Sequence, residues 1–283
     1  MSRFLHKYKF GLELESAPPM VLREATGPNG HSYIVKIFCK GSHTVSHHLL
    51  LIRHLVGFDE EDIQALLVEI NFWLTNTHPS ISQIVEVVQE DPFIYTVYEM
   101  PAGGTLESVL FASDNIFTEA FARGIASSLL NGLAFLHLKG VVHRNCLPAG
   151  IFFRAAHSVP GWPQTAQLST VKANYHPDTN TFLDLKDLAY TMCAVVRRGT
   201  GVFSRQDFNP IILKTREWDF LTPDFVDFVN QLWNADKIAR GAEYFLEHRW
   251  MVSFKKVFTK EDIKSRTSVL DYKLNTKKSG ATS

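Results

Sequence analysis

The sequence predicts an α+β fold with two lobes, a small lobe rich in β-strands with one helix and a second lobe that is mainly helical. Three observations predict this arrangement. Residues 8–99 hold five short segments of strand-like composition and one stretch with helical periodicity. Residues 101–104 are Pro-Ala-Gly-Gly, a composition typical of a connection. Beyond that connection, apolar residues recur at the spacing of helices.

The first three strands are predicted at residues 8–14, 21–25 and 32–38. The segment 32–38 is dominated by β-branched and aromatic side chains, which favour strands. Residues 27–30 before it are Gly-Pro-Asn-Gly, and an Asn-Gly pair favours a tight turn between two strands. The second and third strands are therefore expected to form a hairpin.

A helix is predicted at residues 59–76, followed by two strands at 84–88 and 93–99 that complete the small lobe. Residues 59–61 are all acidic, and negative charge is favourable at a helix N-terminus because of the helix dipole. Apolar side chains from Ile63 to Leu74 form a stripe at helical spacing. The residues that follow, Thr77-His78-Pro79, are expected to end this helix.

The second lobe is predicted to contain helices at 105–112, 118–137, 182–196, 222–234 and 242–250. The segment 118–137 carries an apolar face, and 182–196 has little polar surface, as in a buried helix. Thr222 followed by Pro223 is a typical helix start. Residues 275–283 hold few apolar side chains and are expected to be disordered.

Charge and cysteine content exclude several classes of protein. The 283 residues carry 29 Lys and Arg and 29 Asp and Glu, so no nucleic-acid or membrane-surface partner is predicted. Cys39, Cys146 and Cys193 form no CxxC pair, so neither a metal site nor a disulfide framework is expected. No apolar run approaches the ~20 residues of a membrane span, and we find no signal peptide. We expect a cytoplasmic protein, with the nucleus left open, whose partners are other proteins.

The most informative segment is Gly140–Phe153. His143 and Arg144, a Pro four residues after the Arg and a closing apolar triplet resemble the catalytic loop of eukaryotic protein kinases, which has the pattern HRDxxxxN. The position of the catalytic Asp is Asn145, and the position of the metal-binding Asn is Gly150. The resemblance implies a bilobal kinase fold with a degenerate catalytic loop.

Further kinase-like motifs occur in the expected order. Residues 33–36, Tyr-Ile-Val-Lys, resemble the VAIK signature, which implies that Lys36 stands where the family's phosphate-pairing Lys stands. Glu69 lies ten residues before Pro79 and fits the helix Glu that pairs with this Lys. The two residues are either a remnant ATP site or a brace between strand and helix. Tyr98 falls at the gatekeeper position before the connection, where it narrows any adenine pocket.

Two other motifs depart from the family pattern. The segment 15–22 matches the glycine-rich loop, yet Glu15, Ala17 and Met20 replace its three glycines. Thr170 stands at the Asp of the DFG motif, with Val171 and Lys172 after it. Since Mg²⁺ prefers carboxylate oxygen, the three positions Asn145, Gly150 and Thr170 predict a site without metal.

The resemblance also implies a domain plan and a structural role for Asp184. The kinase-like domain is expected at residues 8–252, with the small lobe at 8–100, the hinge at 101–104 and the helical lobe at 105–252. Residues 253–283 are expected to be a partly disordered extension. Asp184 begins a segment similar to the family's central helix and is expected to hold the catalytic-loop backbone.

These departures lead to a functional expectation with an alternative. We expect a catalytically inactive, kinase-like protein, a pseudokinase and not an enzyme, that acts as a protein-binding scaffold or allosteric regulator. No cofactor is required, although ATP bound without metal is left open at Lys36 and Glu69. Partner contacts are expected at Trp162, Leu270 and Tyr272. The alternative is a nucleotide-binding switch or an atypical kinase with weak residual phosphotransfer.

Overall fold

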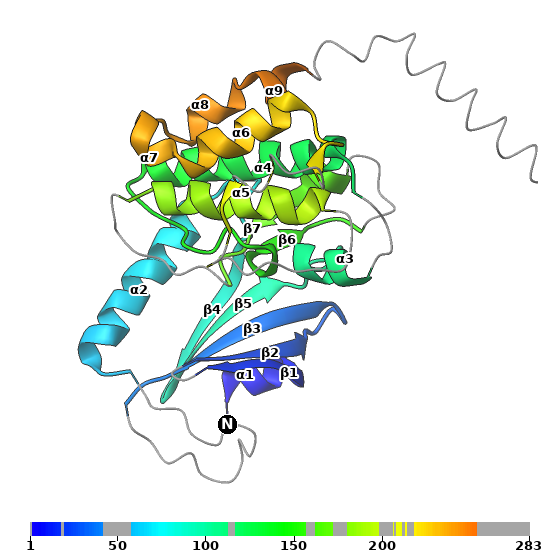
Figure 1. Cartoon of the computed structure of the whole chain (residues 1–283). Helices are drawn as coiled ribbons and strands as arrows, with labels where there is room; N and C mark the ends of the chain where they lie inside the picture. The colour runs from blue at the N-terminus through cyan, green and yellow to red at the C-terminus, as the bar shows by residue number, and fades with distance from the viewer. Residues whose placement is uncertain are drawn as a thin grey trace, which may run out of the picture.

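Both predicted lobes are present in a computed structural model of the chain, in which a five-stranded sheet lies below a group of helices (Figure 1). The fold class is therefore confirmed as a bilobal α+β kinase-like fold. The structure describes the following residues: 2–17, 20–41, 58–112, 117–156, 162–171, 180–197, 206, 208–210, 213 and 218–253.

The small lobe is an antiparallel sheet with the strand order β1-β2-β3-β5-β4. The strands are β1 (Lys9–Ala17), β2 (Met20–Thr26), β3 (Ser32–Cys39), β4 (Ile84–Glu90) and β5 (Phe93–Glu99). The predicted turn between β2 and β3 contains Gly30 at φ 78°, a conformation that glycine adopts without steric cost. All five predicted strands are present, and most extend by one to three residues beyond the predicted ends.

The two faces of the sheet bury different partners, because side chains alternate along each strand. On the outer face, Val35 and Ile37 of β3 join an apolar cluster that includes Phe4 of the short helix α1 (Arg3–Lys7). On the inner face, Phe38 of β3 packs with helix α2 (Glu60–Thr75). Lys36 lies between Val35 and Ile37 and therefore points to the inner face, toward α2.

Helix α1 lies before residue 8 and is absent from the sequence-based prediction. Phe4 stacks on Tyr95 of β5 with ring centroids 4.1 Å apart. Glu90 of β4 accepts hydrogen bonds from the Ser2 hydroxyl and from backbone N–H groups at the helix start, and Glu86 accepts from Lys7 and Tyr8 at 2.6 Å each. A five-residue helix has too few internal bonds to persist alone, so these tertiary contacts explain its formation.

Helix α2 belongs to the hydrophobic cores of both lobes. Its side chains Ile63, Leu66 and Ile70 pack under the sheet. In its last turn, two residues before Thr75, Trp73 is 3% exposed and belongs to the core of the helical lobe. Figure 1 shows the helix running from the sheet toward the helical lobe. The helix therefore connects the two lobes by packing as well as by sequence.

The helical lobe is built around two long helices, α4 (Glu119–Leu138) and α5 (Phe182–Val196), and both were predicted. The other elements are α3 (Leu106–Ala112), η2 (Pro148–Gly150), β6 (Ile151–Phe153), η3 (Trp162–Thr165), β7 (Ala166–Leu168), α6 (Pro223–Trp233), α7 (Ala235–Ile238), α8 (Ala242–Leu246) and α9 (Arg249–Val252). Strands β6 and β7 pair with each other in an antiparallel ribbon.

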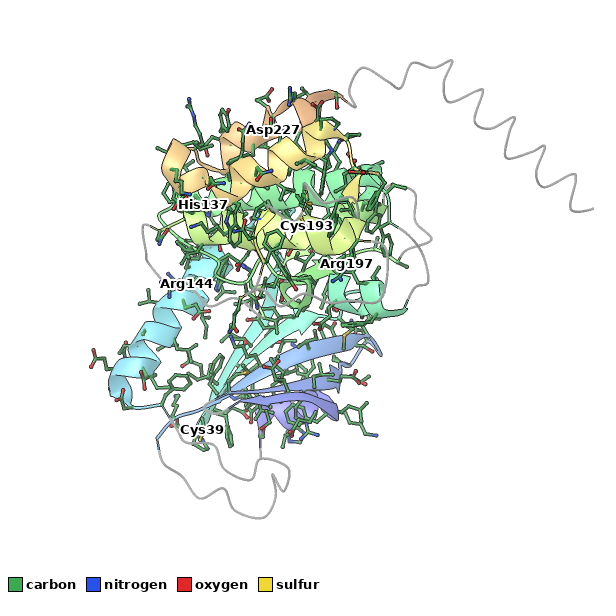
Figure 2. The ribbon with its side chains drawn as sticks, in the orientation of Figure 1. Cys39, His137, Arg144, Cys193, Arg197 and Asp227 are labelled. Atoms are coloured by element: carbon green, nitrogen blue, oxygen red, sulfur yellow. The ribbon has the colours of Figure 1, made fainter. Side chains whose placement is uncertain are left out.

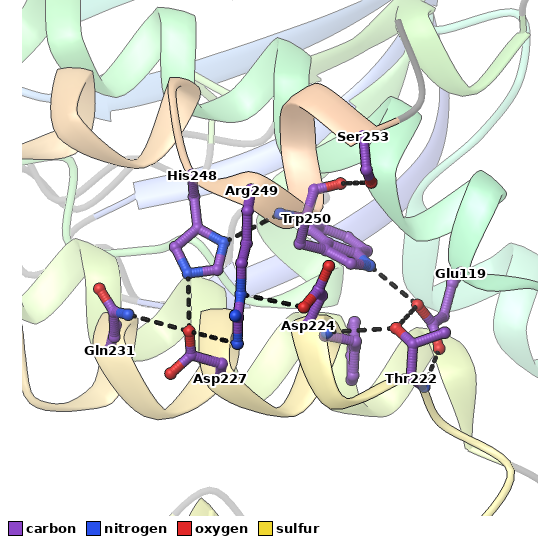
Figure 3. A network of polar contacts seen from close by, with 10 residues as sticks. Glu119, Thr222, Asp224, Asp227, Gln231, His248, Arg249, Trp250 and Ser253 are labelled. Carbon is purple, nitrogen blue, oxygen red and sulfur yellow. Dashed lines mark hydrogen bonds and ion pairs between the residues drawn. The ribbon is translucent and has the colours of Figure 1, made fainter. Parts of the chain in front are cut away.

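The predicted helix 242–250 is instead the two short helices α8 and α9. His248 caps the start of α9, because its Nδ1 accepts a hydrogen bond from the backbone N–H of Trp250. The other ring nitrogen lies 3.3 Å from a carboxylate oxygen of Asp227 on α6. Arg249 of α9 forms ion pairs with Asp224 and Asp227 of α6 (Figure 3). The chain therefore bends at His248 to satisfy these contacts with α6.

All three cysteines are buried and free, and Figure 2 labels Cys39 in the sheet lobe and Cys193 in the helical lobe. In the described ranges, no helix has the length and apolar character needed to cross a membrane.

Candidate functional site

The inner face of the sheet brings Lys36 and Glu69 into electrostatic contact. Lys36 is 9% exposed on β3, where it lies opposite Leu22 and Thr96 in the neighbouring strands. Burial raises the pKa of the Glu69 carboxyl above its ordinary value, while the charge of Lys36 and a hydrogen bond from Trp73 offset part of that effect. Helix α2 and strand β3 thus place the predicted pair together.

Trp73 holds one oxygen of the Glu69 carboxylate. Its indole Nε1 donates to Glu69 Oε1 at 3.3 Å, and the two residues are one helical turn apart. Because the Trp73 ring is buried in the helical lobe and packs edge-on against Phe72, the position of Glu69 depends on that lobe as well as on α2. The spacing of four residues between Glu69 and Trp73 is compatible with such a contact on a helix. No motif in the sequence marked Trp73 as a partner of Glu69.

Tyr98 and Thr170 extend the same group of polar side chains. Burial is the main cause that raises the pKa of the Tyr98 phenol well above its ordinary value, and hydrogen bonding to Thr96 and Thr170 opposes the rise. Thr170 is 1% exposed, and its hydroxyl donates to the backbone oxygen of Ser82 at 3.0 Å. The backbone N–H of Thr170 donates to the Ser82 hydroxyl at 2.9 Å. The residue at the DFG position is therefore bound to the segment before β4.

An apolar cluster joins the lobes beside these polar groups. Its buried members are Leu22 of β2, Ile34 of β3, Tyr98 of β5, Phe152 of β6 and Val171 after β7, each at most 5% exposed. Ile34 is the residue that stands at the Ala of the VAIK signature, and it brings three more carbon atoms to this face. We name this group the lobe-joining cluster. It fills the space between the inner face of the sheet and the β6–β7 ribbon.

Asp184 organises the loop that carries Asn145, as predicted from the sequence. Its carboxylate is fully buried and accepts from the backbone N–H of His143 at 2.9 Å and of Arg144 at 2.7 Å. The ring of His137 lies 2.9 Å from the same carboxylate. Burial opposes ionisation, but these hydrogen bonds hold the pKa of Asp184 below its ordinary value. Arg144 adopts a positive φ of 61°, which the bond to Asp184 helps to maintain.

His143 is a core residue with a defined hydrogen-bonding pattern. Its ring Nδ1 accepts from the backbone N–H of Asn145 at 3.3 Å, so Nε2 carries the proton and donates to the Ser169 carbonyl at 3.2 Å. Burial is the main cause that lowers the pKa of His143. His143, Cys146 and Asp184 place ligand atoms within 4.8 Å of one another, but the backbone contacts above already occupy the His and Asp atoms. We therefore assign this group to loop structure.

Asn145 and Gly150 lie against each other. A Cβ atom at Gly150 would come within 2.2 Å of the Asn145 backbone oxygen and 2.8 Å of its side chain, so only glycine fits in this conformation. Gly150 also accepts a hydrogen bond from Ser169, the neighbour of Thr170. The structure thus places the three predicted degenerate positions in one region. Asn145 contacts Gly150, and Gly150 is bonded to Ser169, which precedes Thr170.

The donor set at these positions does not fit a divalent cation. Asn145, Gly150 and Thr170 supply no carboxylate, and the Thr170 hydroxyl is already hydrogen-bonded to Ser82. Unlike these three positions, the position of the family's phosphate-pairing lysine keeps its residue type. Lys36 stands there, together with its acidic partner Glu69. The described residues therefore fit an anion better than a metal ion.

The remaining predicted residues lie outside what the structure describes. Leu270, Tyr272, Lys172 and the side chain of Trp162 belong to this group. The backbone of Trp162 is described and begins the short helix η3. The domain boundaries remain predictions, and α1 extends the sheet lobe to residues before 8.

Comparisons with known proteins agree with the fold. The family model described as "Protein kinase domain" matches residues 49–159. The chain is similar to CDPK-related kinase 7 of Arabidopsis thaliana, with 24% identity over 231 residues. That match covers 70% of this chain and 38% of the relative, so the chain spans well under half of the relative's length.

Two solved structures share the fold. One is Rad53 residues 1–466 in complex with AMP-PNP, with a TM-score of 0.64 and 15% identity, covering 88% of this chain and 66% of that one. The other is the twitchin kinase region from C. elegans, with a TM-score of 0.65 and 17% identity, covering 88% of this chain and 47% of that one. At these identities the likeness establishes the fold.

One expectation from the sequence is wrong. We expected a protein that is not an enzyme, but the family model and the relatives are those of protein kinases. Asn145, Gly150 and Thr170 stand where the kinase motifs have Asp, Asn and Asp. These substitutions do not by themselves demonstrate a loss of activity. The family model over residues 49–159, the relatives and the solved structures therefore show that the chain is similar to eukaryotic protein kinases and has their fold.

Proposed function

We propose that this protein is an atypical protein kinase that works as a nucleotide-binding switch, with weak phosphotransfer and with ATP bound without metal. The observation that supports this most directly is the pair formed by the buried Lys36 and the half-buried Glu69, which is retained although the neighbouring motif positions are altered. We further propose that a partner protein binds differently to the open and the closed arrangement of the two lobes.

The phosphate end of a nucleotide is the part that the described residues fit. Lys36 supplies a cation on the inner face of the sheet, and kinases use the lysine at this position to pair with phosphate. Rad53, which shares the fold, was solved with the nucleotide analogue AMP-PNP. Both points support a nucleotide as the ligand of the cleft.

The base end explains why binding should change the shape of the protein. In kinases the base lies between the sheet and the helical lobe, next to the hinge. Here Leu22, Ile34 and Phe152 already meet in that space as part of the lobe-joining cluster. A purine can enter only if the two sides of the cluster move apart, so nucleotide binding and lobe opening are coupled.

We expect weak phosphotransfer because the described residues at the motif positions form no cation site. In kinases, metal ions neutralise the charge that develops on the transferred phosphoryl group. Since no carboxylate stands at Asn145, Gly150 or Thr170, the cleft lacks that stabilisation and the rate is expected to be low. The output of the switch is then binding to a partner protein, as a scaffold or allosteric regulator, with Trp162, Leu270 and Tyr272 as candidate contacts.

The test is thermal unfolding of the full chain with ATP, in EDTA and in Mg²⁺. A ligand that binds only the folded state raises the melting temperature. We expect an increase in EDTA that is lost in Lys36→Ala and enlarged in Ile34→Ala, which makes room for the base. An increase only with Mg²⁺, or one unchanged by Lys36→Ala, contradicts the proposal.

Two matched variants separate these effects from general damage. Lys186→Ala removes a lysine that pairs with Asp236 at 3.3 Å on the helical lobe, away from the cleft. Ile37→Ala removes the same atoms as Ile34→Ala, but from the outer face of the same strand. Both should respond to ATP as the wild type does. Transfer of radiolabelled γ-phosphate to the chain or to a generic protein, measured in parallel, should be slow, and a rate typical of active kinases excludes weak phosphotransfer.

A further inference from the structure

A cavity separate from the proposed nucleotide site lies where the connection between the lobes meets the β6–β7 ribbon. Its volume is about 470 Å³, within the range of roughly 300–1,000 Å³ seen for ligand sites. We call it the rear pocket and define it by Val85, Glu99, Met100, Phe152, Arg154 and Gln167. Neither Lys36 nor Glu69 lines it, so it is a separate site.

The rear pocket has an apolar floor and an exposed apolar rim. Phe152 is 4% exposed and also belongs to the lobe-joining cluster, against which Met100 packs. Val85 is 48% exposed at a register irregularity in β4, between Ile84 and Glu86. An apolar side chain placed in the pocket would cover Val85 and extend the buried surface of Phe152 and Met100.

Gln167 presents a hydrogen-bond acceptor to this pocket. The side chain is 9% exposed, and its Nε2 donates to the backbone oxygen of Pro79 at 2.7 Å. Pro79 offers only an acceptor there, so the amide orientation is fixed and Oε1 is left on the other side. Among the described residues nothing donates to Oε1. This oxygen is not among the buried atoms that lack a partner, so water reaches it and a donor group of a ligand can replace that water.

Two opposite charges complete the lining. Glu99, the last residue of β5, and Arg154, just after β6, both line the pocket, and neither forms an ion pair with a described residue. Glu99 and the Gln167 oxygen both attract a donor with positive charge, whereas Arg154 attracts an acid. The pocket therefore fits a ligand that has a basic group, an apolar part and an acidic group.

We propose that the rear pocket binds an extended segment of a partner protein that carries a basic and an acidic side chain flanking an apolar one. The apolar side chain covers Phe152 and Met100, the basic group bonds to Glu99 and Gln167, and the acid bonds to Arg154. A peptide is favoured because β4 ends the sheet order β1-β2-β3-β5-β4, which leaves one edge of β4 without a neighbouring strand in the described sheet. The proposal does not require a bound nucleotide.

The experiment is a titration of the isotope-labelled full chain with the capped peptide acetyl-Lys-Gly-Leu-Gly-Asp-amide, in which the three side chains share one face of an extended segment, followed by backbone amide NMR shifts. We expect shifts that map to Glu99, Met100, Arg154 and Gln167. The neutral peptide acetyl-Gln-Gly-Leu-Gly-Asn-amide should bind about 5-fold more weakly, because it lacks two exposed charge pairs that contribute roughly 0.5 kcal/mol each. Acetyl-lysine-amide alone should also bind more weakly, because it lacks the apolar and acidic groups.

Variants of the pocket test the assignment of each contact. Glu99→Gln and Arg154→Gln remove exposed charges, should leave the fold intact, and should each weaken the charged peptide by about 3-fold or more while leaving the neutral peptide unchanged. Glu107→Gln, an exposed acid on α3, is the matched control and should bind the peptide like the wild type. The proposal is overturned by shifts that map elsewhere, by equal binding of charged and neutral peptides, by equally tight binding of acetyl-lysine-amide, or by no shifts at millimolar peptide.

Discussion

At the scale of single residues, Asp184 of α5 is a polar group on which three described contacts converge, two of them from the loop that carries Asn145. It is completely buried, and a buried carboxylate is tolerated only when its hydrogen bonds are made. The partners are two backbone N–H groups and the His137 ring. Removing the carboxylate leaves all three without an acceptor.

We predict that Asp184→Ala lowers the free energy of unfolding by about 3–5 kcal/mol at pH 7. The folded-state pKa of Asp184 lies below its unfolded value of 3.8, so its contribution to stability is complete above about pH 4 and is lost as the pH falls through the folded pKa. The free energy of unfolding, measured with urea from pH 7 to pH 3, should therefore decrease less in Asp184→Asn than in the wild type, because the variant has no carboxyl group to protonate at this position. Equal slopes would contradict this assignment.

Trp73 offers a second residue-scale prediction. Trp73→Phe keeps an aromatic ring but removes the N–H that donates to Glu69. This bond lowers the pKa of Glu69 against the larger effect of burial, so its loss should raise that pKa further. The carboxyl carbon shift of Glu69, followed by NMR as a function of pH, measures the change directly. Stability should fall by about 1 kcal/mol, a typical value for one hydrogen bond.

A merely structural loss of packing at Trp73 gives a different result. It would lower stability and leave the titration of Glu69 where it is in the wild type. Trp233→Phe on α6, a partly buried tryptophan that packs against the same core, is the matched control. Its Glu69 titration should coincide with that of the wild type.

At the scale of secondary structure, α1 shows what local sequence could not predict. Ser2 caps the helix start, but five residues cannot sustain a helix without help from other elements. The help comes from Glu86 and Glu90 on β4, which lie 78 to 88 residues further along the chain than their partners, and from Tyr95. No periodicity within residues 3–7 contains that information.

We predict that Phe4→Ala destabilises the protein by about 3–5 kcal/mol, the usual cost of emptying a buried aromatic site. Leu5→Ala on the same helix is the control, since Leu5 is 45% exposed and should change stability by less than about 0.5 kcal/mol. Chemical denaturation of both variants measures the difference. Equal effects from the two substitutions would show that α1 does not dock on the sheet through Phe4.

The strands and long helices were predictable because their patterns are local. The segment 32–38 has the side chains of a strand, and 118–137 has the apolar spacing of a helix, whatever the rest of the chain does. The motif residues Lys36, Glu69, Asn145, Gly150 and Thr170 were also located from the sequence. The contact between Trp73 and Glu69, the bond from Thr170 to Ser82, and the rear pocket depend on how distant elements meet, which no local pattern specifies.

At the scale of the whole molecule, the lobes are linked by α2 and by the lobe-joining cluster. Helix α2 contributes Ile63, Leu66 and Ile70 to the core under the sheet and Trp73 to the core of the helical lobe. The cluster adds Leu22 and Ile34 from the sheet and Phe152 from the ribbon. Damage to one lobe should therefore reach the other.

We predict that Ile37→Ala, in the outer core of the sheet, lowers the unfolding midpoint reported by tryptophan fluorescence. All tryptophans of the chain, residues 73, 162, 218, 233 and 250, lie outside the strands, so this signal reports α2 and the helical lobe. Emptying a buried Ile site costs about 2–5 kcal/mol. Independent unfolding of the lobes would leave the fluorescence midpoint unchanged, and circular dichroism would then show two transitions.

The anchoring of His143 and Arg144 by Asp184 has a consequence for the timescale on which the catalytic loop opens. Loop amides normally exchange their hydrogens with solvent quickly, because little structure has to open to expose them. These two amides are held by a carboxylate inside the core, so solvent reaches them only when α5 and α4 separate. In deuterium exchange they should be retained as long as the amides in the middle of α5, which makes this loop one of the slowest-opening segments of the protein.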